Sequence, residues 1–348
     1  LESLEDFFVD LKEPKFRAKQ LLKWIHQKGV LDFNIMTDFN KDLRKKLSSV
    51  AFIEPPKIHQ VHSSDEGTIK YVIELNSGSM VEMVIIPEKN RRTLCVSSQA
   101  GCALQCTFCA TGAQGFDQNL ESHEIIGQLW LANFNQDNTK PITNVVFMGM
   151  GEPLLNYDSV IESAKIMKDQ HSYGLSRKRI TISTSGIIPN INKLSKEIDV
   201  SLAISLHAAE DDLRNVIVPI NKKYPIKSLI KACKEYLNYF DNKRNITIEY
   251  ILIDGINDSI EHAKKLTKLL SDISCKINLI PFNSFNGSDY KRPSNNKINE
   301  FKKYLINKGF IATLRITRGD SVDAACGQLV GNLSNTIKGK NLISHKSM

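Results

Sequence analysis

The sequence predicts an α/β fold in which six β/α units form a parallel sheet, preceded by a small helical domain and a β-hairpin extension. From Thr93 onward, short runs rich in Val, Ile and Thr alternate with amphipathic segments of helical period, which is typical of parallel β/α units. The first 50 residues have helical periodicity, whereas residues 55–87 have the alternation of strands. A chain of 348 residues with 41% hydrophobic residues can bury the core of one large α/β domain with an appendage.

Two basic amphipathic helices are predicted near the N-terminus. Residues 16–28 place apolar side chains at helical spacing between lysines, and Gly29 stands where a helix C-cap belongs. Residues 41–47 form the second basic helix. Such a pair is consistent with a small module that docks nucleic acid or with a packing appendage.

A hairpin is predicted from residues 68–75 and 80–86, which are joined by the turn Asn76-Ser77-Gly78. Glu82 lies in its second strand between two apolar residues. The default interpretation of a glutamate in such an alternating strand is a position on the exposed face.

Strands and helices are expected in alternation through the rest of the chain. The expected strands are residues 94–97, 144–148, 179–184, 200–206, 247–253 and 276–281, and the expected helices are residues 122–133, 159–168, 226–239 and 260–270. In parallel β/α folds the active site lies at the carboxyl ends of the strands, where the loops converge. The changes of pattern along the chain divide it into four expected regions, residues 1–50, 51–87, 88–321 and 322–348. The last region ends in a tail from residue 332 that we expect to be mobile.

Composition limits the compartment and the partners. No apolar run approaches the ~20 residues that span a bilayer, and the acidic start lacks the features of a signal peptide, so we expect a cytoplasmic protein without membrane contact. Seven cysteines, an odd and unevenly spaced set, fit a reducing compartment better than a disulfide framework. The net charge of +8 suits a polyanion such as RNA, although a merely solvated basic surface fits it equally well.

Three of the seven cysteines, Cys102, Cys106 and Cys109, fall within eight residues. Packing on one helix face would explain the spacing, but the two glycines and the threonine of residues 110–115 continue a helix poorly. A structural zinc site needs four ligands, and no second Cys or His pair follows at matching distance. An iron-sulfur cluster fits better, and three thiolates would leave one iron of a four-iron cluster open.

This C-x3-C-x2-C spacing resembles that of the radical S-adenosylmethionine (SAM) superfamily, in which the open iron binds the amine and carboxylate of SAM. Further motifs resemble the RlmN family within it, the RNA methyltransferases of adenine carbon 2. The motifs are LCVSSQAGC at 94–102, FMGMGEPLLN at 147–156, STSG at 183–186, SLH at 205–207 and DAACGQL at 323–329. The resemblance implies a partial (β/α)6 radical SAM barrel and an RNA-docking function for the N-terminal helices.

The resemblance also implies the residues of the site. Cys102, Cys106 and Cys109 would ligate a [4Fe-4S] cluster. The positions that correspond to contacts with SAM in the family are Gly151, Glu152, Ser183, Ser205, Leu206, His207 and Asn283. A glycine-glutamate turn or a single histidine would otherwise be an ordinary structural feature.

Three further residues would carry the methyl transfer implied by the resemblance. Cys326 would take a methyl group from one SAM, and a second SAM, cleaved by an electron from the cluster, would give a radical that activates this methyl for addition to adenine. Glu82 or Cys95 would assist loss of the carbon-2 proton, and Cys95 would release the product by forming a Cys95–Cys326 disulfide that thiol exchange resets. Without the resemblance, packing in the core is the competing explanation for either cysteine.

The implied partners are 23S rRNA in the peptidyl-transferase region, tRNA at the adenine 3′ of the anticodon, and an electron donor such as flavodoxin, with the protein acting as a monomer. RNA phosphates would be bound by Arg91-Arg92, Arg177-Lys178-Arg179 and Lys222-Lys223. The alternatives are methylation of adenine carbon 8 within the same superfamily and a non-catalytic iron-sulfur redox sensor that binds RNA. The sensor has no need of Cys95, Cys326 or the Gly151-Glu152 turn, and their joint presence disfavours it.

Overall fold

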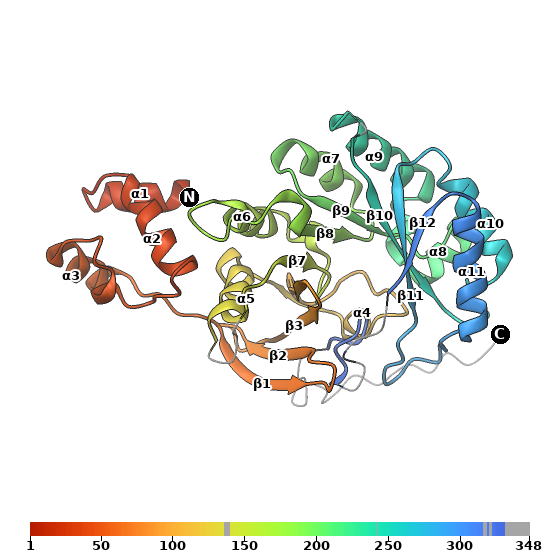
Figure 1. The fold of residues 1–348 in the computed structure, drawn as a ribbon, viewed down its shortest axis with the longest axis horizontal. Helices are drawn as coiled ribbons and strands as arrows, with labels where there is room; N and C mark the ends of the chain where they lie inside the picture. Colours follow the sequence, from red (N-terminus) through yellow and green to blue (C-terminus); the bar gives the residue numbers. More distant parts are fainter. Residues whose placement is uncertain (136–139, 242, 316–318, 320–321, 331–348) are drawn as a thin grey trace.

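The computed structural model describes residues 1–135, 140–241, 243–315, 319 and 322–330, so the tail predicted from residue 332 lies outside the described residues. A ten-stranded sheet runs through the molecule in the order β1-β2-β3-β4-β7-β8-β9-β10-β11-β12 (Figure 1). Its antiparallel part consists of β1 (Lys57–Ser63), β2 (Ile69–Glu74) and β3 (Met80–Glu88). Its parallel part consists of β4 (Arg91–Cys95), β7 (Asn144–Phe147), β8 (Ile180–Thr184), β9 (Ser201–Ser205), β10 (Ile246–Leu252), β11 (Cys275–Pro281) and β12 (Ile311–Leu314).

The predicted α/β class is confirmed, and each of the six expected strands is present within a few residues of its expected bounds. The structure adds β12, a parallel strand beside β11, and β1, an exposed edge strand beside β2. Neither was expected, because β12 has four residues and β1 is mostly polar, so both give weak strand patterns. The hairpin is joined to the barrel, since β3 pairs antiparallel with β4.

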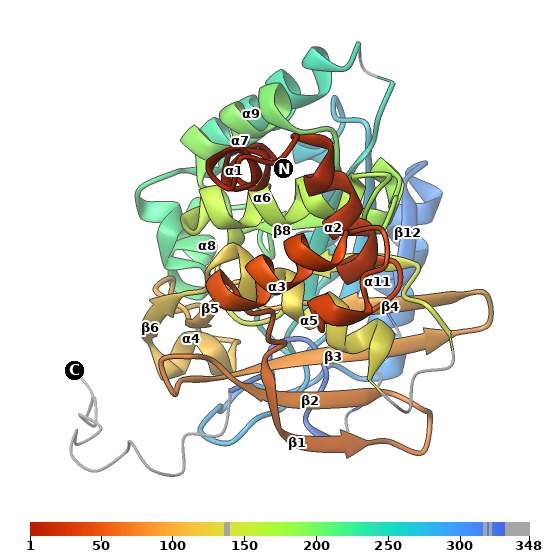
Figure 2. The same cartoon turned by 90° about the vertical axis from the view of Figure 1, so that its left-hand side faces the viewer.

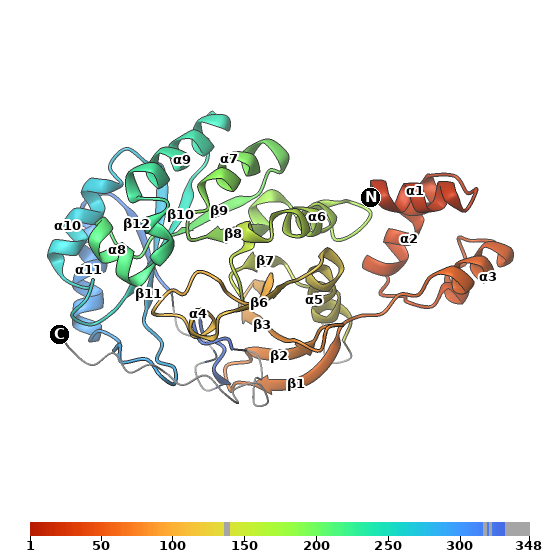
Figure 3. The same ribbon diagram turned by 180° about the vertical axis from the view of Figure 1, so that it is seen from behind.

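Helices cover the outer face of the parallel strands (Figure 3). The four expected helices correspond to α5 (Ser122–Phe134), α6 (Tyr157–Lys168), α9 (Ile226–Tyr239) and α10 (Ile260–Leu269). Three more lie between strands: α7 (Ile188–Glu197), α8 (Asp211–Ile217) and α11 (Asn295–Asn307). The sequence pattern of α11 is dominated by Asn and Lys, although Ile298, Phe301 and Leu305 are buried on its inner face.

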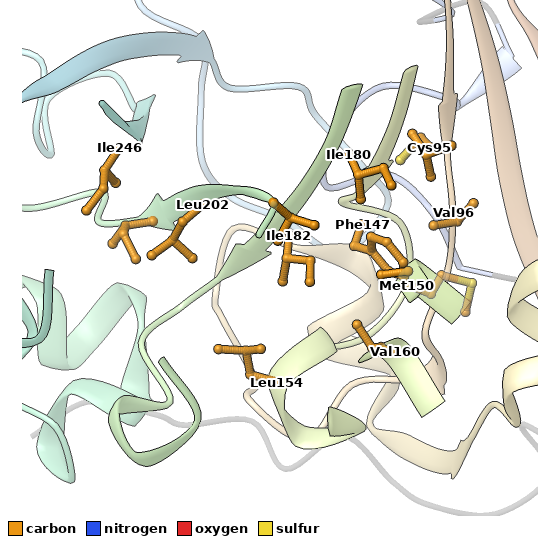
Figure 4. Close-up of a cluster of buried hydrophobic side chains, with 14 of the residues drawn as sticks. Cys95, Val96, Phe147, Met150, Leu154, Val160, Ile180, Ile182, Leu202 and Ile246 are labelled. Carbon is orange, nitrogen blue, oxygen red and sulfur yellow. The ribbon is translucent and has the colours of Figure 1, made fainter. Parts of the chain in front are cut away.

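Side chains of the parallel strands alternate between an apolar outer face and a polar inner face. The outer residues form the main hydrophobic core with the helices, and Figure 4 shows part of it, including Phe147, Ile182 and Leu202. The intervening residues of β8 and β10, such as Thr181 and Glu249, line a cavity inside the barrel instead. The fold therefore keeps an open, polar interior rather than a packed one.

The N-terminal region forms its own small core from α1 (Glu2–Asp10), α2 (Phe16–His26) and α3 (Lys41–Val50), which stand beside the barrel in Figure 1 and in front of it in Figure 2. One more helix is present here than the two expected. The N-terminal region meets the barrel where Trp130 of α5 donates a hydrogen bond from Nε1 to the carbonyl oxygen of Ile25 at 3.0 Å. Beside it, His26 Nδ1 lies 3.1 Å from the Tyr173 hydroxyl, and burial lowers the pKa of His26 to about 4. Among the described residues, no helix is long and apolar enough to cross a membrane.

Candidate active site

The three clustered cysteines lie on a loop between β5 (Gln99–Gly101) and α4 (Ala110–Gln114), after which the chain returns in β6 (Phe116–Asn119). Cys109 is the N-cap residue of α4, and residues 102–108 have no helical structure. The interpretation of the cysteines as one face of a helix is therefore wrong.

Two glycines let this loop fold back on itself. Gly101 has φ +71°, and a Cβ there would lie 1.9 Å from the Gly115 carbonyl oxygen. A Cβ on Gly112 would lie 2.9 Å from the backbone nitrogen of Cys106. Because backbone atoms cannot move aside as a side chain can, both positions require glycine, and the thiols of the loop are held in one place.

All three thiols face a cavity of about 150 Å³ at the carboxyl ends of the strands, which is also lined by Glu152 and His207. Burial raises the pKa of Cys102 to about 12. Burial, followed by the charges of Cys109 and Cys102, raises the pKa of Cys106, and burial also raises the pKa of Cys109. Backbone N–H groups of Thr111 and Gly112 point at Cys109.

This donor set fits a metal cluster held by three thiolates. Positive metal bonded to buried thiolates offsets both their desolvation and their mutual repulsion. No three His, Cys, Asp or Glu side chains among the described residues are arranged around a single metal ion. A structural zinc site needs a fourth protein ligand, whereas three thiolates suffice for a four-iron cluster that keeps one iron open.

Glu152 presents a buried carboxylate on the wall of the same cavity. Its Oε2 accepts from the Ser185 backbone N–H at 2.8 Å and its Oε1 from that of Leu154 at 3.1 Å. Gly151 has φ +98°, and a Cβ there would lie 2.5 Å from Gln99 Cβ, so this turn also requires glycine. Burial raises the pKa of Glu152, although these N–H donors oppose the shift.

The serines and the histidine predicted from the motifs come from neighbouring strands. The hydroxyl oxygens of Ser183 and Ser205 lie 3.4 Å apart, and both residues line the cavity. His207 Nδ1 accepts from the Ile251 backbone N–H at 3.0 Å, which leaves the ring proton of the neutral form on Nε2. Burial lowers the pKa of His207 to about 3, and the ring packs edge-on against Phe108 with 4.7 Å between centroids.

Two of the predicted SAM positions differ from the other five. Leu206 is fully buried and does not line the cavity. Asn283 lines a second cavity and donates from Nδ2 to the Cys326 carbonyl oxygen at 3.2 Å.

Cys326 lies on a segment, residues 322–330, that hydrogen bonds tie to the cluster loop. The backbone N–H of Ala110, next to Cys109, donates to the Gly327 carbonyl at 2.7 Å. The Thr111 hydroxyl donates to the Leu329 carbonyl at 2.5 Å. Cys326 lines the first cavity and also the second, which has a volume of about 510 Å³. The thiol thus stands at the boundary between the two spaces.

Cys95 closes β4 and lines the second cavity only. Burial raises its pKa to about 12, with a further contribution from the negative charge of Cys326. Both cysteines are free thiols. The structure therefore brings Cys95 and Cys326 to one cavity although 230 residues separate them in the sequence.

Glu82 is buried, with 3% of its surface exposed, so its default interpretation as an exposed-face residue is wrong. It forms an ion pair with Lys70 at 3.3 Å, and its Oε2 accepts from the Val330 backbone N–H at 3.3 Å. Lys70 donates in turn to the Asp323 carbonyl oxygen at 3.3 Å. Burial raises the pKa of Glu82 and Lys70 opposes the shift. Glu82 lines neither cavity. The ion pair of Glu82 and Lys70 instead contacts the Cys326 segment at both ends, at Val330 and Asp323.

Sequence reasoning missed Lys70, Glu249 and Arg315. Glu249 and Arg315 line both cavities, as Cys326 does. A lysine or glutamate inside a predicted buried strand is a signal, because such residues are rarely buried without a partner. Of the predicted RNA-binding segments, Arg91 and Lys178 lie on the wall of the second cavity.

Comparisons with known proteins agree with this site. The profile of the ribosomal RNA large subunit methyltransferase N-terminal domain matches residues 1–53, and that of the radical SAM superfamily matches residues 96–267. The chain is 55% identical over 337 residues to the dual-specificity RNA methyltransferase RlmN of Pseudomonas putida strain F1, covering 95% of this chain and 88% of the relative. For the protein of the same name in Pseudomonas entomophila strain L48, identity is 54% over 340 residues, covering 96% and 90%.

Among solved structures, a radical SAM methyltransferase from Sphaerobacter thermophilus superposes with a TM-score of 0.88 at 39% identity, covering 94% of this chain and 96% of that one. The resemblance inferred from the motifs is thereby confirmed over nearly the whole chain. By sequence, by fold and by its cysteine loop, the chain belongs to the RlmN family of radical SAM RNA methyltransferases.

Proposed function

We propose that this chain methylates carbon 2 of adenine in 23S rRNA and in tRNA, with Cys326 as the carrier of the methyl group. The observation that carries the proposal is the position of Cys326 between the cavity of the clustered cysteines and the cavity that contains Cys95. A sulfur at this boundary can receive a methyl group on one side and deliver it on the other.

The radical SAM family binds a [4Fe-4S] cluster and SAM, which together supply hydrogen abstraction from an unreactive methyl group. Cys102, Cys106 and Cys109 would hold the cluster. The buried Glu152 carboxylate would accept hydrogen bonds from the SAM amino group, and Ser183, with Ser205, would contact its other polar groups. Phe108 and His207 would cover the cluster side of the cavity and exclude water.

The first chemical step of the chain itself is methylation of Cys326. Its thiolate attacks the methyl group of one SAM, so that a sulfur–carbon bond forms on Cys326 while the sulfonium bond breaks and the thiol proton is lost to solvent. Cys95 lines only the second cavity, which keeps its thiol away from the methyl group of this SAM. A second SAM is consumed in each turnover to activate the methyl group for addition to carbon 2.

Release of the product uses Cys95. After the carbon attached to Cys326 has bonded to adenine, carbon 2 loses its proton to a base and one electron, which the oxidised cluster would take up. The Cys95 thiolate then attacks the Cys326 sulfur, a disulfide forms, and the electron pair of the breaking sulfur–carbon bond takes a proton to complete the new methyl group. An external thiol reduces the Cys95–Cys326 disulfide. An electron donor such as flavodoxin would supply electrons to the cluster.

The carbon-2 proton is taken in this proposal by Glu82, whose side chain projects from the same face of the sheet as that of Cys95. Because Val84 opposes Cys95 and Glu82 lies two residues before Val84 on the same strand, the two side chains project from the same face of the sheet. In this structure the Glu82 carboxylate accepts a hydrogen bond from the Val330 N–H and forms an ion pair with Lys70. Glu82 would therefore act once the end of the Cys326 segment moves away from it.

The target adenine would enter the second cavity, whose volume of about 510 Å³ exceeds that of a base. An adenine can reach a buried thiol only when it is unstacked, so loops of structured RNA are the expected substrates. Arg91 and Lys178 at the wall of this cavity, with Arg92, Arg177, Arg179 and the Lys222-Lys223 pair, would bind phosphates. The N-terminal helices would hold more distant parts of the RNA, with one chain bound to each RNA.

Mapping the methylated atom tests the proposal. Large-subunit rRNA and tRNA would be isolated from cells that lack the protein, with or without wild-type, Cys95→Ala or Cys326→Ala protein supplied. Wild type should restore 2-methyladenine, and the two variants should not. Cys275→Ala, which changes a half-buried cysteine outside both cavities, is the matched control and should act as wild type. Methylation at carbon 8, or activity without Cys326, would contradict the proposal.

A further inference from the structure

A row of polar side chains crosses the inside of the barrel at one level. The register of the parallel strands places Ser205 of β9 beside Glu249 of β10, Glu249 beside Asn278 of β11, and Asn278 beside Thr313 of β12. All four side chains line one or both cavities. Four polar residues in register in the interior of a β/α barrel are not needed for packing, since the interior is ordinarily filled by branched apolar side chains.

Two hydrogen bonds of this row run from Thr313 through Asn278 toward Glu249. The Thr313 hydroxyl donates to Asn278 Oδ1, and Asn278 Nδ2 donates to Glu249 Oε1 at 2.9 Å. With Oδ1 occupied as an acceptor, Asn278 is fixed with its amide N–H₂ toward the glutamate. The row therefore orients the carboxylate and satisfies one of its two oxygens.

The other oxygen, Glu249 Oε2, is buried and has no hydrogen-bond partner among the described residues. Only 3% of the surface of Glu249 is exposed, and the residue lines the cavity of the clustered cysteines as well as the cavity of Cys95. A buried carboxylate oxygen without a partner is costly, because the lost hydration is not replaced. Such an atom at the wall of a binding cavity is expected to meet a donor on the ligand.

We propose that Glu249 Oε2 accepts a hydrogen bond from an adenosine bound inside the barrel, through a ribose hydroxyl or the exocyclic amine. The inference rests on the proposed function, which brings two adenosines to this interior, one in SAM and one in RNA. Both carry the same donors, and Glu249 faces both cavities. The carboxylate then distinguishes adenosine from ligands that lack a donor at this point, and Thr313 and Asn278 act as positioning residues.

Glu249→Gln is the sharpest test, because it preserves size while changing the hydrogen-bonding pattern. Asn278 Nδ2 requires an acceptor, so the new amide oxygen faces Asn278 and the new N–H₂ group takes the place of Oε2. Two donors then oppose each other at the ligand. We expect the affected adenosine to bind about tenfold to a hundredfold more weakly.

Two measurements on the anaerobic holoenzyme separate the sources of adenosine. Equilibrium dialysis gives the dissociation constant of SAM without any turnover. The kcat/KM for a stem-loop RNA at saturating SAM reports on the target nucleotide, with the target adenosine compared with purine riboside, which lacks the amine, and with 2′-deoxyadenosine. Loss in the first measurement alone assigns the contact to SAM. A fall in kcat/KM for the target adenosine assigns the contact to the target nucleotide. The analogue for which wild type and variant have equal kcat/KM lacks the donor, and so identifies it.

Glu124→Gln is the matched control, since Glu124 is also a buried glutamate but caps α5 away from both cavities. It should change neither measurement. If Glu249→Gln does not fold by circular dichroism, Glu249→Asp, which keeps the charge and withdraws the carboxylate from the ligand, should give the same loss. Wild-type values for both measurements in a folded Glu249 variant would overturn the inference. Absence of SAM binding or RNA methylation in the wild type would instead overturn the proposed function.

Discussion

The buried ion pair between Lys70 and Glu82 gives a prediction whose size follows from the structure. The charged atoms are 3.3 Å apart, and the two side chains are 8% and 4% exposed. At an effective dielectric constant of about 20, this distance corresponds to an attraction of about 5 kcal/mol, which offsets the desolvation of both groups. Lys70→Met leaves the carboxylate buried without its partner, and loss of one member of such a pair costs about 3–5 kcal/mol when the other stays charged.

The cost depends on pH, because Glu82 can become neutral instead. Burial already raises the pKa of Glu82, and Lys70 opposes this shift, so the pKa rises further in Lys70→Met. A carboxyl group whose pKa is raised by folding favours the folded state below its unfolded pKa, and this contribution is lost as pH rises through the folded pKa. The variant should therefore lose more stability relative to wild type at about pH 8.5 than at about pH 6.

Anaerobic thermal unfolding at the two pH values measures this difference, and single-turnover methylation measures its effect on the reaction. If ionised Glu82 takes the carbon-2 proton, the acidic limb of the pH–rate profile moves to higher pH in Lys70→Met. Lys70→Arg keeps the charge and should behave nearly as wild type. The double variant Lys70→Met with Glu82→Gln should regain most of the lost stability, since no unpaired charge remains, but not the activity.

Equal destabilisation by Lys70→Met at both pH values, with no recovery in the double variant, would refute this reasoning. It would mean that Lys70 contributes through packing, or through its bond to the Asp323 carbonyl, and not through the charge of Glu82.

Three further predictions concern the cysteines and the glycines. In Cys95→Ala no thiol can attack Cys326, so RNA should remain covalently attached to the protein, which a denaturing gel detects as a shifted band that nuclease removes. Gly112→Ala places a Cβ 2.9 Å from a backbone nitrogen of the cluster loop, and iron bound per reconstituted chain should fall well below that of wild type. Gly29 has φ +67° and lies against the Phe134 ring, where a Cβ would be 2.6 Å away, so Gly29→Ala should loosen the N-terminal helices. If these helices hold RNA, the KM for RNA rises in that variant with little change in kcat; an unchanged KM would contradict their docking role.

Local patterns predicted much of the fold. The strand runs from residue 94 to residue 281 were recognisable because parallel strands covered by helices are rich in Val, Ile and Leu on their outer face. The position of the site followed from the same patterns, since Cys102, Glu152 and His207 each come shortly after a predicted strand. The functions of Glu82, Cys95, Cys326 and the SAM-binding residues came from the resemblance and stay predictions, as do the four regions proposed for the chain.

What could not be predicted depends on pairing between distant segments. The sequence around Lys70 does not predict its contacts with Glu82 across the hairpin and with residue 323 near the other end of the chain. The same holds for the hydrogen bonds that tie Gly327 to Ala110. Glu249 and Asn278 are different, because each is a polar residue inside a predicted parallel strand, and that departure from the apolar pattern is a signal of a polar interior that sequence reasoning passed over.

The central claim is that the Cys326 sulfur carries the methyl group to RNA. Mass spectrometry of the Cys326 peptide, after incubation of the reduced holoenzyme with SAM that has an isotope-labelled methyl group, tests it most directly when RNA is added afterwards. We expect labelled methyl on Cys326 before RNA is added, and the label in the adenine base afterwards. Labelled adenine formed while the Cys326 peptide never gains the methyl group would contradict the account.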